Sequence, residues 1–440
     1  MSIITAKFGG TSLASASQIK KVAEIIKANP DRRYVVASAP GKRFSDDIKI
    51  TDLLYKTHAQ FTNGGDFSGT LDKISQRYSE IINELGIEFD IDSELDAIQK
   101  NIIAGASADY PASRGEYINS KIIAKFLGWE FVDASEVIFF KDNGHLNEKK
   151  TFTAMGERLK ALDYAVIPGF YGSLPDGSIK TFSRGGSDVT GSIVARSVNA
   201  DLYENWTDVS GMLSADPRVV KSPRVIENIT YTELRELSYM GASVLHEDAV
   251  FPVRKAGIPI NIRNTNKPED HGTLIAASLP PEARAKRKAV TGIAGRKGFT
   301  SVRVEKSMMN GETGFCVHLL SIFAKNGIPF EHCPTGIDTI SVIVSSDLFD
   351  AQRETVLREI KNELEPDFIT IEKNLSAIAI VGEGMVSVKG IAAKVFKALA
   401  DANINVRMID QGSDELNIIV GVDESDYVKA INALYEAMIA

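Results

Sequence analysis

The last third of the chain contains an internal repeat, and this repeat limits the possible folds more than any other feature. Residues 309–347 align without a gap to residues 385–423, at a shift of 76 positions. Each copy has the order strand, glycine loop, amphipathic helix, strand, turn, strand, helix, which predicts two tandem ferredoxin-like βαββαβ modules. Such a pair behind an enzyme-sized domain is more often a ligand sensor than a purely structural element, which is the alternative. The identical pairs include Met309 with Met385, Gly314 with Gly390, Ala324 with Ala400, Ile328 with Ile404 and Asp347 with Asp423.

Strand-like and helix-like segments alternate over the first 280 residues, a pattern that predicts a largely parallel sheet covered by helices on both faces. Ligands of such sheets bind at the carboxyl ends of the strands. The segment 266–288, with three prolines and a charge cluster, marks the boundary of this region, and the basic run 284–288 within it looks like a solvated linker. We therefore predict domains at 1–280, 304–372 and 373–440. The strand candidates are 34–40, 164–170, 201–209 and 258–264, and helices are expected at 17–29 and 187–200.

The first predicted strand ends in KFGGTS, residues 7–12. Glycines at 9 and 10 allow a ligand to approach the backbone closely, and the helix that follows offers unpaired amides to anionic oxygens. Ser12 is a candidate N-cap of that helix. We interpret the stretch as a phosphate cradle with Lys7 beside it. The alternative is an ordinary tight turn with a surface lysine.

A second stretch, SRGGSD at 183–188, has the same arrangement of a cation, two glycines and a hydroxyl or acid at a helix start. A polyphosphate site needs amide cradles, a cation on the transferred phosphoryl group and a carboxylate to hold that cation. Lys7 and Asp188 fill these roles if the two turns converge, which favours a nucleotide-dependent phosphotransferase. Further turns of this type are SAPGK (38–42), SRGE (113–116, expected at a helix start), Thr207-Asp208 and Asp216-Pro217-Arg218.

Several protein classes are excluded or disfavoured. The lysine precedes its glycines and no GxxxxGK[ST] follows a strand, so the chain is not a P-loop enzyme. The protein-kinase motifs and zinc-site spacings are absent. A net charge of −8 argues against nucleic acid as a partner, and two cysteines, Cys316 and Cys333, fit a reducing cytoplasm. We also expect no signal peptide and no membrane partner, since no apolar run could span a bilayer.

Taken together, KFGGTS, SRGE, SRGGSD, WTDV with DPR (206–218) and GASVLH (241–246) resemble the aspartokinases over essentially the whole chain. The absence of a dehydrogenase half favours the monofunctional, lysine-sensitive type. The resemblance implies the amino-acid-kinase fold, a three-layer α/β/α sandwich with a mainly parallel sheet, followed by two ACT domains. It also implies the formation of 4-phospho-L-aspartate from L-aspartate and ATP with Mg²⁺, the first step toward lysine, threonine and methionine.

The resemblance assigns roles to individual residues. Lys7 would contact the transferring phosphoryl group, and Asp188 would orient Lys7 and the phosphate-binding turns. Arg184 would pair with the α-carboxylate of the substrate and Glu116 would hold its ammonium group. No residue is assigned as a metal ligand. The remaining implied contacts are Thr51, Phe170 and Ser187 for the substrate, and Gly9, Gly10, Ser38, Thr207, Asp208, Asp216 and Arg218 for ATP.

This chemistry agrees with the residues present. The nucleophile is a carboxylate with a pKa of ~3.9, ionised at neutral pH, so no general base is required. The protein must instead overcome repulsion between two anions, which is the work of Lys7, Mg²⁺ and the backbone amides. Arginine at position 184 suits bidentate binding of a carboxylate better than lysine would.

Three features depart from the family pattern. Many relatives have tyrosine in place of Leu213 and lysine in place of Ser243, both on the nucleotide side. The stretch 38–54 is also longer than in the shortest relatives, which bears on the assignment of Thr51.

The regulatory half is expected to bind lysine as a feedback inhibitor, with threonine as the alternative. Either Glu331 or Asp338 could hold the ε-ammonium group, and both could instead be surface acids. ACT domains pair through their strands, which implies a homodimer or homotetramer, and residues 289–303 are expected to join the last domain. The residues that match the inhibitor site are Met309, Gly314, Phe315, Phe330, Glu331, Thr335 and Asp338.

Two other functions compete with this hypothesis. A kinase of glutamate or another amino acid would share the fold, and Glu116 with Arg184 argues against it. A catalytically inactive amino-acid sensor would keep the ACT pair, and intact Lys7 and Asp188 argue against that.

Overall fold

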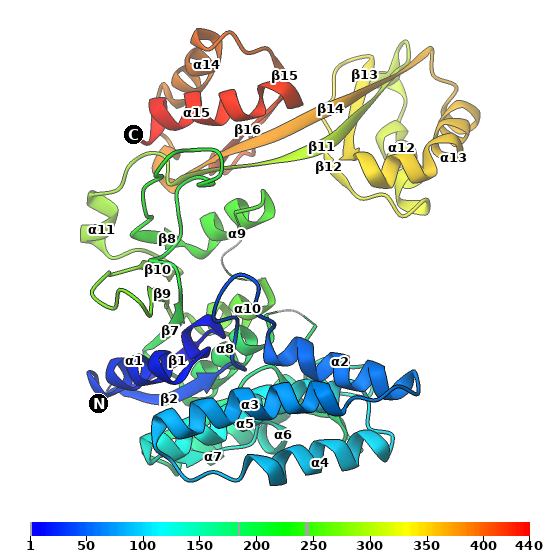
Figure 1. The fold of residues 1–440 in the computed structure, drawn as a ribbon. Helices are drawn as coiled ribbons and strands as arrows, with labels where there is room; N and C mark the ends of the chain where they lie inside the picture. The colour runs from blue at the N-terminus through cyan, green and yellow to red at the C-terminus, as the bar shows by residue number, and fades with distance from the viewer. Residues whose placement is uncertain (1, 184, 243–244, 246) are drawn as a thin grey trace. The chain divides into compact units, whose positions relative to one another are not determined.

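A computed structural model of the chain describes residues 2–183, 185–242, 245 and 247–440. The chain forms two compact units, each described here by itself (Figure 1). No helix in this described part is long and apolar enough to cross a membrane. The predicted division at 1–280, 304–372 and 373–440 stays a prediction. Unit 1 comprises Met1–Met212, Glu227–Tyr231 and Val244–Leu279, and unit 2 comprises Leu213–Ile226, Thr232–Ser243 and Pro280–Ala440.

Unit 1 is built on an eight-stranded, mainly parallel sheet, as the alternating pattern predicted. The strand order is β3-β4-β2-β1-β7-β9-β10-β8, in which β10 pairs antiparallel with β9 and parallel with β8. A separate hairpin joins β5 (Tyr171–Ser173) and β6 (Ile179–Thr181). The strands of the main sheet are β1 (Ile4–Phe8), β2 (Arg32–Ala37), β3 (Glu130–Phe131), β4 (Ala165–Pro168), β7 (Leu202–Thr207), β8 (Asn228–Thr230), β9 (Ile260–Asn264) and β10 (Thr273–Ala276).

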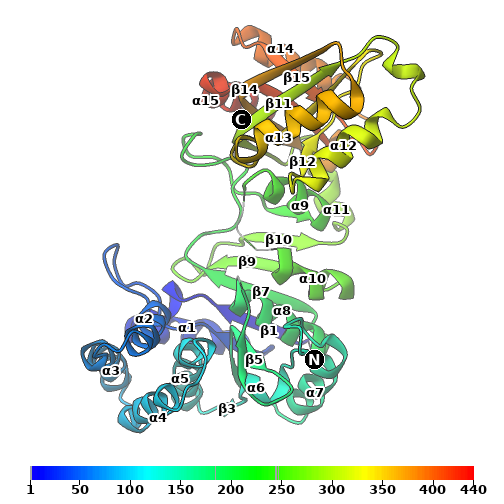
Figure 2. The same cartoon turned by 90° about the vertical axis from the view of Figure 1, so that its right-hand side faces the viewer.

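Helices cover both faces of this sheet, with α1–α5 on one side and α7 and α8 on the other (Figure 2). Because side chains alternate along a strand, Ala6 and Phe8 join the core under α1, α3, α4 and α5, while Lys7 points to the face covered by α8. The helices are η1 (Thr11–Leu13), α1 (Ala16–Lys27), α2 (Ile50–Thr62), α3 (Ser68–Leu85), α4 (Ile91–Ile103), α5 (Asp109–Leu127), α6 (Ala134–Val137), α7 (Glu148–Lys160), α8 (Gly186–Val198), α9 (Tyr231–Tyr239, which continues into unit 2) and α10 (Glu247–Ala256).

Two local predictions were wrong. Ser12 is not the N-cap, because a 3₁₀ turn intervenes before α1, and Ser15 accepts the capping bond from the Gln18 amide at 3.4 Å. The SRGE stretch is not at a helix start either, since α5 begins at Asp109. The side chains of SRGE, and not free helix amides, are therefore what it offers to a ligand.

Unit 2 is built on one antiparallel six-stranded sheet with the order β12-β13-β11-β14-β16-β15. Its two central strands are 14 residues long, and both modules of the repeat share them (Figure 1). The strands are β11 (Gly292–Glu305), β12 (Phe330–His332), β13 (Thr339–Ser345), β14 (Phe368–Val381), β15 (Val406–Asp410) and β16 (Asn417–Asp423). The helices are α11 (Pro281–Ala285), η2 (Met309–Gly311), α12 (Phe315–Lys325), α13 (Ser346–Leu364), η3 (Glu383–Met385), α14 (Ile391–Asp401), η4 (Glu424–Asp426) and α15 (Tyr427–Met438).

Both copies of the repeat follow the predicted order of elements. Gly314 and Gly390 precede the first helix of each copy with φ angles of 89° and 88°. This left-handed conformation favours glycine, which explains why the aligned repeats share it. Each copy encloses its own apolar core, one around Phe323 and the other around Leu399.

The basic run 284–288 is not a fully solvated linker, contrary to the prediction. The side chain of Arg287 is 9% exposed and contacts the carboxylates of Glu233 and Glu383, the latter at 2.8 Å. Glu233 also accepts a hydrogen bond from the Thr291 hydroxyl at 2.7 Å. The run therefore anchors the residues that precede β11 to α9.

Candidate active site

The predicted ligand-binding turns meet at one edge of the sheet. β4, β2, β1 and β7 are neighbours and run parallel, so their carboxyl ends lie together. Backbone bonds link the turns to the next strand: the Ser38 amide donates to the Phe8 carbonyl at 3.2 Å, and the Gly169 amide to the Ala37 carbonyl at 3.0 Å. The turns after β1, β2 and β4 therefore form one continuous rim.

The turns after β1 and β2 touch through their backbones. The Gly41 amide donates to the Gly10 carbonyl at 2.7 Å. A Cβ on Gly41 would lie 2.5 Å from the carbonyl carbon of Gly10, and one on Gly10 would lie 2.9 Å from the Ala39 oxygen. Gly9 lies next to Lys7, since a Cβ there would be 3.6 Å from the lysine Nζ. Gly10 and Gly41 therefore let the two turns lie closer together than any side chain at these positions would allow.

Lys7 and Asp188 converge, as the similarity of their turns suggested. The Lys7 Nζ lies 2.6 Å from Asp188 Oδ1, and the two side chains are 9% and 21% exposed. Asn205 on β7 donates to the same oxygen at 2.8 Å, and the Tyr203 hydroxyl donates to the Asp188 carbonyl at 3.1 Å. Our sequence reasoning missed Asn205, although an amide inside a buried strand is a usable signal.

The turn after β4 packs against the start of α8. Phe170 has a φ of 81°, and its amide donates to Thr190 Oγ1 at 3.1 Å. A Cβ on Gly186 would lie 2.5 Å from the Phe170 ring, and one on Gly169 would lie 2.5 Å from Ser187 Oγ. The predicted substrate residues Phe170 and Ser187 are thus on adjoining segments.

Glu116 is a buried acid with spare hydrogen-bonding capacity. It is 5% exposed, and its Oε2 has no partner among the described residues. Burial raises the pKa of Glu116 to about 8, against the opposing effects of the amides of Ala39 and of Glu116 itself and of the Arg114 charge. A buried carboxyl group with a free oxygen suits a cationic ligand group, because only such a partner would offset its desolvation.

Arg114, which belongs to the SRGE stretch but was assigned no role of its own, is enclosed by aromatic rings. Its guanidinium carbon lies 4.3, 4.9 and 5.1 Å from the ring centres of Tyr117, Tyr110 and Tyr171. Its Nε donates to Ser113 Oγ at 3.0 Å, while Nη2 has no partner among the described residues. The spacing of Tyr110, Arg114 and Tyr117 along one helical face could have revealed this arrangement.

Other predicted site residues take no part in the contacts around Lys7, Phe170 and Glu116. Thr51 lies half-buried in the first turn of α2, and Thr207 donates to the exposed Asp208 at 3.2 Å at the end of β7. Asp216 and Arg218 belong to unit 2, where they pair with each other at 2.7 Å. Their part in a nucleotide site stays a prediction.

Two of the predicted positions, Arg184 and Ser243, lie outside the described residues. Leu213, the other departure from the family pattern, belongs to unit 2 and forms an isolated β-bridge with Val225.

Comparison with known proteins places the chain in a family. Residues 2–264 match the amino acid kinase family and residues 378–438 match an ACT domain. The chain is 38% identical to aspartokinase 3 of Bacillus subtilis over 450 residues, which cover 99% of this chain and 98% of that protein. The chain belongs to the aspartokinases of the amino acid kinase family. It is 30% identical to aspartokinase 2 of the same organism, with 99% and 98% covered.

Solved aspartokinases share this fold. The aspartate kinase of Clostridium acetobutylicum matches with a TM-score of 0.90 and 52% identity over 100% of both chains. Aspartokinase III of E. coli, solved with aspartate and ADP, matches with a TM-score of 0.72 at 24% identity, also over 100% of both chains. The predicted kinase fold with a mainly parallel sheet is confirmed.

The predicted effector residues of this aspartokinase lie around α12 and β12 in unit 2. Met309 and Phe315 are buried in the core of the first module, and Gly314 caps α12. Phe330 and Thr335 are exposed. Phe315 therefore packs inside the module, whereas Phe330 is exposed to solvent and accessible to a ligand or a partner.

Both candidate acids for an effector ammonium group already have partners. Glu331 accepts a hydrogen bond from the Tyr239 hydroxyl at 2.5 Å and lies 3.6 Å from Arg296. The Asp338 carboxylate accepts from the Met308 amide at 2.9 Å. A cationic effector at either acid would have to share or displace these contacts.

Proposed function

We propose that this aspartokinase transfers the γ-phosphoryl group of ATP to the β-carboxylate of L-aspartate, as the first step toward lysine, threonine and methionine. The observation that most directly supports this reaction is the buried contact of Lys7 with Asp188 at 2.6 Å, next to Gly9 and Gly10. The names of the relatives at 38% and 52% identity support the same substrate.

Aspartate is proposed to bind with its ammonium group at Glu116, whose unpaired Oε2 gains a partner on binding. Arg184 pairs with the α-carboxylate in this proposal, and Phe170, Ser187 and Thr51 complete the contacts. Charged partners for both groups on the α-carbon leave the β-carboxylate, at the other end of the molecule, directed at the phosphate, which is the geometric requirement for transfer.

In the reaction, a β-carboxylate oxygen forms a bond to the γ-phosphorus while the bond to the β,γ-bridging oxygen breaks. The bridging oxygen keeps the electron pair, and ADP leaves. No proton is transferred from the nucleophile, because aspartate is already ionised at neutral pH. Lys7 reduces the repulsion between the two anions. Asp188 holds its ammonium group in place, and Asn205 in turn donates to Asp188.

ATP is proposed to lie along the turns of Gly9, Gly10 and Ser38, with Thr207 and Asp208 at the end of β7. The described residues contain no group of three or more His, Cys, Asp and Glu side chains that could hold a metal. Asp208, an exposed carboxylate at the end of β7, would hold the Mg²⁺ ion that accompanies the phosphates. Bound Mg²⁺ would neutralise phosphate charge.

Lysine is the proposed feedback inhibitor, with threonine as the alternative, and the first ACT module is the proposed site. Glu331 and Asp338 are the acids offered to its ammonium group, beside the residues around Met309, Gly314 and Thr335. Binding at Glu331 would compete with the Tyr239 hydroxyl, whose helix α9 begins in unit 1. Helix α9 is therefore the proposed route by which effector binding alters the kinase unit.

We also propose that the protein is a homo-oligomer, a dimer or tetramer, that pairs through its ACT modules. An apolar groove of about 710 Å³ lies between α12 and β12. Val317 on the helix is 66% exposed and Phe330 on the strand is 48% exposed. Apolar side chains this open on an edge strand and its neighbouring helix suit the same surface of a second copy.

Trapping of the acyl phosphate tests this function. The purified protein is incubated with ATP, Mg²⁺ and L-aspartate, and hydroxylamine converts the product to a coloured hydroxamate. The proposal expects hydroxamate from aspartate, suppressed by lysine. Product from glutamate but not aspartate would reject the substrate, and suppression by threonine alone would reject lysine as the effector.

A further inference from the structure

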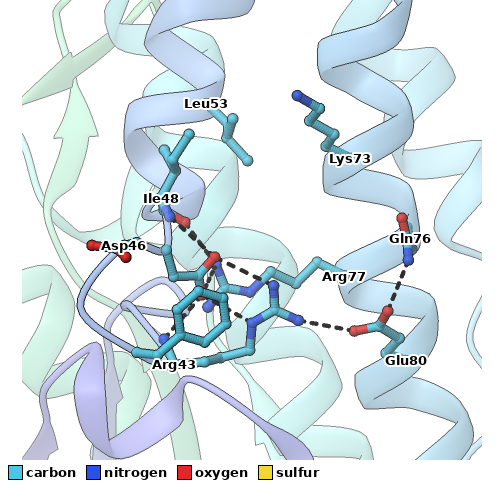
Figure 3. Close-up of a pocket in the computed structure, with 10 residues that line it drawn as sticks. Arg43, Asp46, Ile48, Leu53, Lys73, Gln76, Arg77 and Glu80 are labelled. Atoms are coloured by element: carbon cyan, nitrogen blue, oxygen red, sulfur yellow. Dashed lines mark hydrogen bonds and ion pairs between the residues drawn. The ribbon is translucent and has the colours of Figure 1, made fainter.

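Arg77 on α3 is a buried cation outside the site described so far. It is 4% exposed. Its guanidinium group donates to the carbonyl oxygens of Gly41, of Ile48 at 2.7 Å and of Ala14 at 3.4 Å, and lies 3.2 Å from Asp47. Figure 3 shows Arg77 reaching from its helix toward the loop that carries Ile48. A planar group with five fixed donors can serve several acceptors at once.

The acceptors of Arg77 lie just behind the two glycine turns of the candidate active site. Gly41 closes the turn after β2, and its amide binds the Gly10 carbonyl. Ala14 follows the 3₁₀ turn that continues from Gly10. Ile48 ends the loop that leads into α2. One side chain on α3 therefore connects two segments that are separate in the sequence, the turn after β1 and the loop between β2 and α2.

We propose that Arg77 is a positioning residue for phosphoryl transfer, which holds the turns after β1 and β2 at the separation at which their amides face the transferred phosphate. This inference rests on the proposed function. Oriented amides lower a reaction barrier only when they are aligned before the reaction. The turns hold each other directly through the backbone bond from the Gly41 amide to the Gly10 carbonyl, and neither glycine has a side chain to add a further contact, so Arg77 reinforces this single link.

Neighbouring cations do not share this role. Arg43 also binds Asp47, at 2.9 Å, and it reaches outward to Glu80 at 3.0 Å, but its side chain is 36% exposed. Lys73, one turn before Arg77 on α3, is exposed. A cavity of about 240 Å³ lies beside Arg77, lined by residues that include Arg43, Lys73 and Glu80. This opening gives small molecules access to the guanidinium group.

The test compares Arg77→Met with the matched control Lys73→Met on the same helix. We expect Arg77→Met to lower kcat by at least about tenfold, with KM values for ATP and aspartate within about threefold, and Lys73→Met to change neither. Arg77→Lys should fall between, since one ammonium group cannot reach all the acceptors. In Arg77→Ala, millimolar methylguanidinium should enter the cavity and restore part of kcat.

Hydrogen exchange provides a readout that does not depend on activity. Amides of residues 9–14 and 38–49 should exchange faster in Arg77→Met, while those of β4 and β7 keep their protection. Faster exchange with an unchanged kcat per folded molecule would make Arg77 merely structural and overturn the proposal, as would an unchanged exchange pattern. If Arg77→Met does not fold, absence of rescue in Arg77→Ala and a wild-type kcat in Arg77→Lys would overturn it. If the wild-type protein shows normal hydrogen exchange but makes no 4-phospho-L-aspartate, the proposed function is rejected instead.

Discussion

Replacing Glu116 by glutamine should stabilise unit 1 in a pH-dependent way. The folded-state pKa of about 8 lies above the usual 4.5 of glutamate because the carboxyl group is buried. The stability contributed by its protonated form is complete below about pH 4.5 and is lost as the pH rises through 8. The difference between the two values corresponds to about 5 kcal/mol, an upper limit for this loss.

Glutamine has the same shape and does not titrate, so Glu116→Gln should escape this loss. Near pH 4.5 the variant and the wild type should unfold at similar urea concentrations. At about pH 9 the variant should be more stable by several kcal/mol, within the limit of about 5. The assay is urea unfolding followed by tryptophan fluorescence. It reports on unit 1 alone, because the two tryptophans of the chain, Trp129 and Trp206, both belong to that unit.

The exposed Glu88 provides the control for the same exchange of a carboxyl group for an amide on the surface of unit 1, as Glu88→Gln. A stability difference between Glu116→Gln and the wild type that does not grow with pH would refute the reasoning. The same substitution should weaken aspartate binding, because glutamine cannot offer a charge to the ammonium group. In the wild type, the KM for aspartate should fall as the pH rises toward 8, and in the variant this trend should vanish.

Substitutions at three further positions test the phosphate side of the site. Lys7→Ala should lower kcat by at least about 100-fold while aspartate binding, measured by calorimetry, is largely kept; full activity would disprove the role of the lysine. Asn205→Leu should lower kcat by roughly tenfold because Asp188 loses a 2.8 Å hydrogen bond. Asn205→Asp should lower kcat further, since it places two carboxylates together. A kcat equal to that of the wild type in both variants would contradict this. Gly41→Ala should reduce kcat/KM for ATP strongly, because the added Cβ would lie 2.5 Å from the opposite turn. Gly69→Ala, where no atom lies within 4 Å, is the control for that steady-state assay.

The sequence allowed correct prediction of features that repeat or alternate. The 76-residue repeat predicted both regulatory modules, and the shared pattern of KFGGTS and SRGGSD led to the contact of Lys7 with Asp188. The first prediction succeeds because similar sequence patterns form similar elements. The second succeeds because parallel strands bring their carboxyl ends to one edge, so that residues distant in sequence can be placed together.

Features that depend on backbone atoms, or on a single partner far away in the sequence, could not be predicted in this way. Arg77 lies in a helix whose pattern is that of a surface helix, and its acceptors are carbonyl groups, which no sequence pattern displays. Ser12 and Ser15 both precede α1, and only the intervening 3₁₀ turn decides which one caps it. Arg287 looked like part of a solvated basic run because its partner Glu233 is distant in the sequence.

The two long central strands of unit 2 have a consequence for protein engineering. Residues 299–305 of β11 pair with β13 of the first module, whereas residues 292–296 of the same strand pair with the part of β14 that adjoins β16. Neither module can therefore be exchanged as a unit by cutting the chain once between 304–372 and 373–440. Such a cut would leave an unpaired strand edge on each fragment, and exposed edges promote aggregation. A chimera with a new effector specificity should instead keep both strands whole and replace only the helices and outer strands attached to them.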